Sequence, residues 1–121
     1  MAVVRYIVDD VDQAVAFYRD GLGFAVVQQF GPAMAMVEQG DLRLWLAGPM
    51  ASASRPMPDG AQPVPGGWNR FVVTVDDIEA VVARLRGLEI RFRNEIITGP
   101  GGRQVLCVDP SGNVVELFQP A

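Results

Sequence analysis

The sequence predicts an α+β fold built from two tandem β-α-β-β-β modules, and three observations support this prediction. An apolar run that ends in Val-Asp-Asp occurs at residues 8–10 and again at residues 75–77, which indicates an internal duplication. Each copy continues with apolar residues at the spacing of an amphipathic helix. Three short runs with the alternation typical of strands then follow each helix.

The first module is expected to span residues 2–49. Its Asp pair can cap a helix whose apolar stripe consists of Val11, Val15, Tyr18 and Leu22. Turns at Gly31-Pro32 and Gln39-Gly40-Asp41 separate the strand runs that follow. These runs are predicted at Phe24–Phe30, Ala33–Glu38 and Leu42–Ala47.

The second module is expected to span residues 68–121 and repeats this order. Its helix stripe consists of Ile78, Val82, Leu85 and Leu88. Turns over residues 99–102 and 109–113 are rich in Gly, Pro, Asp and Asn, which suits tight reversals of the chain. The predicted strand runs are Ile90–Thr98, Arg103–Val108 and Val114–Gln119.

Residues 50–67 connect the modules and are rich in Pro, Gly, Ser and Ala, with little periodicity. This composition occurs both in tethers between repeats and in mobile lids, and both interpretations stay open. Residues 1–121 are treated as a single domain, because a chain of this length and apolar content suits one modest core.

Composition excludes several classes of function. The formal net charge is −4 and the basic residues are scattered, so nucleic acid is not an expected partner. No apolar run has the length of a membrane span, and the N-terminus lacks the apolar block of a signal peptide. The single Cys107 excludes an intramolecular disulfide. We therefore expect a soluble, cytoplasmic protein.

The stretches VDDVDQAVAFYRDGLGF, VDDIEAVVARLRGLEI and DPSGNVVELF resemble the vicinal oxygen chelate superfamily. That group contains glyoxalase, the bleomycin-resistance binding proteins, fosfomycin-resistance enzymes and extradiol dioxygenases. The resemblance covers nearly the whole chain. It implies that the two modules form a curved mixed sheet around a cleft with the helices outside, and that the protein is a homodimer.

Enzymes of that superfamily bind a divalent metal through histidines and acids in the cleft. Glu116 matches one acid position, whereas the two histidine positions fall at Val3 and Arg70 and the other acid position falls near Leu44 or Trp45. The chain contains no histidine at all. Arg cannot donate an electron pair to a metal, so we predict no metal or other cofactor at this place.

Glu116 poses a separate question, because an acid in an apolar strand is costly to bury without a partner. We expect it to form an ion pair with Arg70, either as a purely structural bridge or as part of a ligand site. In β-strands alternate residues face opposite sides of the sheet. This alternation places Trp45 on the face away from the helix and makes it the counterpart of Glu116. The residues predicted to line the cleft are Arg5, Arg43, Trp45, Arg70, Val72, Thr74, Glu116 and Phe118.

Two classes of function follow from these residues. The favoured one is metal-independent binding of a small organic molecule, as in bleomycin-resistance-type proteins. The alternative is an enzyme related to glyoxalases and dioxygenases, acting as a lyase, isomerase or dioxygenase. Such an enzyme would either be metal-free, with Glu116 as general base and Arg70 stabilising an enolate or oxyanion, or hold a divalent metal at a non-standard site.

Overall fold

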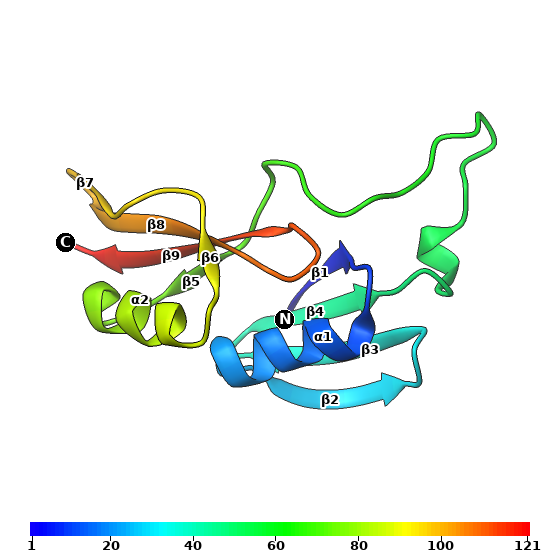
Figure 1. The fold of residues 1–121 in the computed structure, drawn as a ribbon, viewed down its shortest axis with the longest axis horizontal. Helices are drawn as coiled ribbons and strands as arrows, with labels where there is room; N and C mark the ends of the chain where they lie inside the picture. The colour runs from blue at the N-terminus through cyan, green and yellow to red at the C-terminus, as the bar shows by residue number, and fades with distance from the viewer. The chain divides into compact units, whose positions relative to one another are not determined.

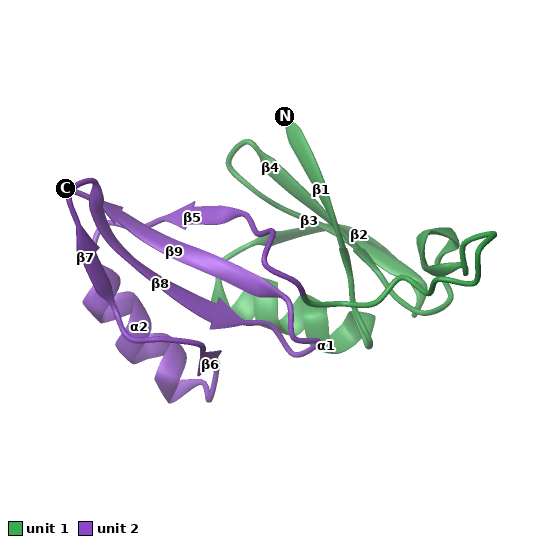
Figure 2. Cartoon of the chain, turned by 90° about the horizontal axis from the view of Figure 1, so that it is seen from above, with its two compact units in different colours: residues 1–66 green, residues 67–121 purple.

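The computed structural model describes all 121 residues. The chain divides into two compact units, residues 1–66 and residues 67–121, which Figure 2 shows in different colours. Each unit contains one mixed sheet and one main helix, so the predicted α+β fold with two β-α-β-β-β-like modules is confirmed. None of the helices has the length and apolar character needed to cross a membrane.

Unit 1 contains a four-stranded sheet in the order β1-β4-β3-β2 (Figure 1). Strand β1 runs parallel to β4, and the other neighbours are antiparallel. Helix α1 packs on β3 and β4 and buries the side chains that alternate toward it, among them Tyr6, Leu44 and Leu46. The strands are β1 (Ala2–Ile7), β2 (Ala25–Phe30), β3 (Met34–Gln39) and β4 (Leu42–Ala47).

Helix α1 (Val11–Ala16) begins where the duplicated aspartates predict. Asp10 is its N-cap, and its side-chain oxygen accepts a hydrogen bond from the backbone N–H of Gln13 at 3.0 Å. A π-helical turn over Phe17–Gly21 continues the helix. All four residues of the predicted stripe are buried, so this part of the prediction is confirmed.

The segment after β4 contains a short 3₁₀ helix, Ser52–Ser54, and belongs to unit 1. Ser54 is buried, and its hydroxyl donates to the backbone oxygen of Gly48 at 2.7 Å. Gln62 in turn donates its side-chain amide to the backbone oxygen of Ser54. These contacts hold the first part of the segment against the end of β4.

Unit 2 contains the strand order β5-β9-β8-β6, with β7 paired to β8. Strand β5 runs parallel to β9, as β1 does to β4. Helix α2 (Ile78–Gly87) packs against β9. The strands are β5 (Val72–Thr74), β6 (Arg91–Phe92), β7 (Ile97–Gly99), β8 (Gly102–Val108) and β9 (Val114–Pro120).

The second aspartate cap is also present, because the Asp77 side chain accepts from the backbone N–H of Ala80 at 3.1 Å. The predicted stripe of α2 is wrong at its last member. Leu88 is 51% exposed, since the helix ends at Gly87 and Glu89 adopts a positive φ of 63° that turns the chain away. The other three stripe residues are buried.

The strand predicted over Ile90–Thr98 is two short strands, β6 and β7. Asn94 causes the interruption, because its side-chain oxygen accepts the backbone N–H of Leu106 at 2.9 Å. In a continuous ladder a backbone carbonyl would occupy that place. The side-chain amide therefore satisfies the β8 backbone while residues 93–96 leave the regular ladder.

The turn between β8 and β9 is organised by the fully buried carboxylate of Asp109. One of its oxygens accepts the backbone N–H groups of Ser111 and Asn113, and the other accepts the side-chain amide of Asn113 at 3.0 Å. Gly112 supplies the positive φ of 93° that the reversal requires. This turn fixes the start of β9, the strand that carries Glu116.

Candidate functional site

The sheet of unit 2 presents a mixed apolar and polar face on the side opposite α2. Val72 lies beside Glu116 in the parallel ladder, and Thr74 lies beside Phe118. Leu106 of β8 is the partner of Glu116 on the other side. Partners in neighbouring strands share a face, so these five side chains form one surface. Val72 is 49% exposed there, whereas Glu116 is largely covered.

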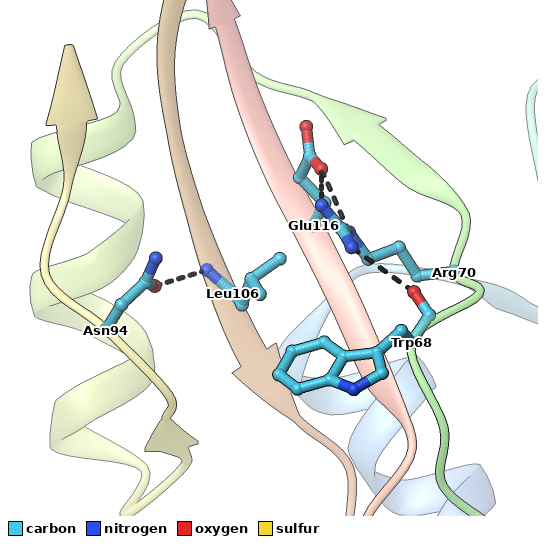
Figure 3. Close-up of polar contacts among 5 residues, drawn as sticks. All are labelled: Trp68, Arg70, Asn94, Leu106 and Glu116. Carbon is cyan, nitrogen blue, oxygen red and sulfur yellow. Dashed lines mark hydrogen bonds and ion pairs between the residues drawn. The ribbon is translucent and has the colours of Figure 1, made fainter.

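Arg70 and Glu116 form the predicted ion pair on this face (Figure 3). Nε and one terminal nitrogen of Arg70 both donate to the same oxygen of Glu116, Oε1, at 3.0 and 2.9 Å. The other terminal nitrogen donates to the backbone oxygen of Trp68 at 3.2 Å. The side chains of Arg70 and Glu116 are 30% and 11% exposed, so the pair is partly desolvated and held on both sides of the guanidinium.

The second carboxylate oxygen of Glu116, Oε2, points away from Arg70 in Figure 3 and has no hydrogen-bond partner in the protein. The single buried side-chain nitrogen or oxygen without a partner in this structure is Nε1 of Trp45, so Oε2 of Glu116 reaches the surface. The pair therefore presents an open acceptor oxygen beside an apolar wall.

Trp68 extends this surface. The residue is 63% exposed, and the guanidinium carbon of Arg93 lies 4.2 Å from the ring centroid. Its backbone oxygen is the acceptor for Arg70. The same residue thus contacts two arginines, one through its ring and one through its main chain.

In unit 1, three of the predicted residues share the sheet face opposite α1. Arg5 of β1 is the ladder partner of Trp45, and its guanidinium carbon lies 4.9 Å from the centroid of the indole ring. Arg43 donates to one oxygen of Glu38 through two nitrogens, at 3.1 and 2.8 Å. Met36 is the partner of Trp45 on the other side. Arg43 is therefore already neutralised by a cross-strand acid.

Trp45 and Glu116 occupy equivalent positions in the two modules. Trp45 is the ladder partner of Arg5, and Glu116 is the ladder partner of Val72. Arg5 and Val72 are equivalent, because each lies three residues before the Val of its Val-Asp-Asp repeat. This register confirms that Trp45, and not the buried Leu44, is the counterpart of Glu116. The indole Nε1 of Trp45 is buried without a hydrogen-bond partner, which leaves one donor unsatisfied on that face.

The eight predicted site residues fall into two groups, each brought together by one sheet. The first group is in unit 1 and the second in unit 2: Arg5, Arg43 and Trp45, and Arg70, Val72, Thr74, Glu116 and Phe118. Sequence reasoning missed the contribution of Arg93, because residues 93–96 carry no periodic pattern. The aromatic beside Arg93 in the sequence, Phe92, is not its stacking partner, so the local pattern does not identify the contact with Trp68.

The side chains present do not fit the divalent metal that the resemblance implies. Such metals need imidazole or carboxylate ligands, and this face offers one carboxylate whose Oε1 lies 2.9 Å from a guanidinium nitrogen. Arg70 repels a second cation and has no lone pair to donate. Nowhere in the chain do three or more Cys, Asp or Glu side chains gather in a way that could hold a metal ion.

Cys107 is not a candidate nucleophile. It is fully buried on the helix side of β8, and burial raises the pKa of its thiol to about 12. The reactive thiolate form is therefore almost absent at neutral pH.

Comparison with known proteins gives consistent matches over nearly the whole chain. Residues 1–117 match the family model described as Glyoxalase/Bleomycin resistance protein/Dioxygenase superfamily. The mitochondrial methylmalonyl-CoA epimerase of Mus musculus is 30% identical over 96% of this chain and 70% of its own length. The bleomycin resistance protein of Geobacillus stearothermophilus is 27% identical over 93% of this chain and 90% of its own.

Among solved structures, TnmS3, an antibiotic binding protein from Streptomyces sp. CB03234, superimposes with a TM-score of 0.74. It is 28% identical, and the match covers 98% of this chain and 93% of that one.

Proposed function

Because this chain belongs to the Glyoxalase/Bleomycin resistance protein/Dioxygenase superfamily, we propose that it binds a small organic molecule without the help of a metal. The binding surface is the face of the unit 2 sheet that carries Arg70 and Glu116. The observation that carries this proposal is the ion pair itself, in which the Arg70 guanidinium binds one oxygen of Glu116, the residue at the acid position that the resemblance implies for a metal ligand. The relatives named for bleomycin resistance and antibiotic binding support this class of function.

The chemistry of the face fits an organic ligand with both apolar and hydrogen-bonding parts. Val72 and Phe118 offer apolar contact, and Thr74 adds a hydroxyl. Oε2 of Glu116 accepts a hydrogen bond from an N–H or O–H group of the ligand, since Arg70 does not occupy it. A few fixed polar groups on an apolar wall are typical of small-molecule sites.

A thermal-shift screen in the presence of EDTA tests the proposal, using glycopeptide antibiotics, aromatic acids and aldehyde adducts as ligands. Hits are then measured by isothermal titration calorimetry. We expect binding that is unchanged by EDTA and is lost in Thr74→Trp, where the new ring covers the face. The matched control is Thr98→Trp, because Thr98 is also exposed on a strand of unit 2 but faces the other side of the ladder. Binding that needs an added divalent metal, or that survives Thr74→Trp, contradicts the proposal.

A second candidate is a metal-free reaction in which Glu116 takes a proton and Arg70 stabilises the enolate that forms. The open Oε2 of Glu116 is the observation that favours it, together with the 30% identity to an epimerase. Incubation with methylmalonyl-CoA in D₂O tests it, because proton removal at C2 exchanges that hydrogen for deuterium. Exchange that disappears in Glu116→Gln supports the enzymatic function. If the unmodified protein causes no exchange, this reaction is ruled out and only the proposed binding function is retained.

A further inference from the structure

Unit 2 contains a second feature, an open groove of about 430 Å³ between the end of α2 and β6. It shares Arg93 with the surface around Trp68, but neither Arg70 nor Glu116 lines it, so an inference about it does not rest on the proposed function. Its lining residues are Arg86, Ile90, Arg91, Phe92, Arg93, Asn94 and Glu95.

The charge of this groove is opposite to that of the whole protein. The chain has a formal net charge of −4, yet three arginines and one glutamate line the groove, which leaves an excess of two positive charges. A concave surface lined by one sign of charge raises the local concentration of ions of the other sign. The groove therefore attracts small anions.

The guanidinium groups of the groove are also poorly neutralised by the protein. Arg86 reaches Glu95 at 3.5 Å, and these side chains are 50% and 91% exposed, so the pair is weak. Arg91 has no carboxylate within ion-pair distance, and Arg93 contacts only the ring of Trp68. In contrast, the other side-chain ion pairs are at 2.8–2.9 Å: Arg19–Asp20, Arg43–Glu38, Arg70–Glu116 and Arg103–Glu79.

Local structure places two of these groups, Arg91 and Arg93, on one side of β6. Arg91 and Arg93 alternate along β6 and its continuation, so both side chains leave the same side of the strand. Their Cα atoms are about 7 Å apart at the rise of an extended strand. Phe92 points to the other side, toward α2, as its ladder partner Cys107 does, and Arg86 lies over its ring, 5.0 Å from the centroid. Arg86 therefore borders the groove from the helix side of β6. Stacking on a ring occupies the face of a guanidinium and leaves its N–H edge free for an acceptor.

We propose that this groove binds a phosphate-bearing small molecule through Arg91 and Arg93. Guanidinium forks match the oxygens of a phosphate group and form charge-assisted hydrogen bonds with them. The excess of two positive charges complements a dianion such as a phosphate monoester or a larger polyphosphate. Because Arg93 stacks on Trp68, an anion bound to Arg93 lies close to the indole, and the fluorescence of Trp68 can report binding.

Isothermal titration calorimetry with inorganic pyrophosphate at low ionic strength tests the proposal. We expect saturable binding that Arg91→Ala weakens about tenfold, the effect of losing one charge-assisted hydrogen bond. Glu95→Gln should strengthen binding, because it removes the single negative charge of the groove. In a Trp45→Phe background, pyrophosphate should also change the fluorescence of Trp68.

The matched control is Arg55→Ala, which removes the same charge from an exposed arginine of unit 1. It should leave the affinity for pyrophosphate unchanged. The proposal is overturned if Arg55→Ala weakens binding as much as Arg91→Ala, since the attraction would then be non-specific. It is also overturned if Glu95→Gln has no effect, if succinate binds as tightly as pyrophosphate, or if millimolar pyrophosphate does not bind.

Discussion

Replacement of Arg70 by Met gives the sharpest test of how this protein keeps an acid in its second sheet. Met preserves much of the apolar stem of Arg but removes both donors to Oε1 of Glu116. The Glu116 side chain, which is 11% exposed in the structure, then has no partner for that oxygen. We expect the free energy of unfolding to fall.

The size of this loss lies between two limits. Breaking a fully buried ion pair costs about 3–5 kcal/mol, and an exposed pair is worth about 0.2–1 kcal/mol. The Arg70 side chain is 30% exposed and Oε2 of Glu116 already reaches the surface, so we expect a loss of about 2 kcal/mol. With a urea m-value of about 2 kcal/mol/M, the unfolding midpoint should fall by about 1 M.

A double-mutant cycle with Glu116→Gln isolates the pair from other effects of the substitution. The Arg70→Met/Glu116→Gln protein should be more stable than Arg70→Met alone, because no charge is left without a partner. Equilibrium urea unfolding of the four proteins measures the coupling. A loss below about 0.5 kcal/mol in Arg70→Met, or additive effects in the double variant, would refute the reasoning. A stable Arg70→Met protein that binds the same ligands would leave the pair without a role in recognition.

Two further predictions concern the duplicated caps and the buried thiol. Asp10→Ala and Asp77→Ala should each lower the free energy of unfolding by about 1 kcal/mol in urea, whereas Asp76→Ala, which removes an adjacent carboxylate that caps no helix, should change it far less. Burial raises the pKa of the Cys107 thiol from 9.0 to about 12, so the unfolded chain releases this proton first and stability should fall as the pH rises from 9 toward 12. Cys107→Ala should flatten that decline, and an unchanged slope would argue against burial as its cause.

The duplication made much of this fold predictable from the sequence. The two aspartate caps marked where both helices begin, and the parity of the strand residues separated the helix face from the opposite face in each sheet. Parity and the position of Arg70 were also enough to anticipate the pair with Glu116. These features depend on local spacing, which a single sequence displays directly.

Other features depend on contacts that spacing does not encode. The break between β6 and β7 arises because the Asn94 side chain replaces a backbone acceptor. The sequence alone does not indicate that an asparagine in a strand run will accept such a hydrogen bond. The pairing of Arg43 with Glu38 required the strand register, because these residues come from different strands. The stack of Arg93 on Trp68 joins two irregular segments, where no period exists to predict which residues meet.

The Asp109 turn also has a consequence for the order of folding. The hairpin that it closes joins residues near in sequence, so it can form within about 1–10 μs and bring Glu116 into place early. Arg70 is 46 residues from Glu116, and closing that longer loop comes later. The Arg70 guanidinium should therefore bind Glu116 only after the folding transition state. Its removal should speed unfolding while leaving the rate of refolding nearly unchanged.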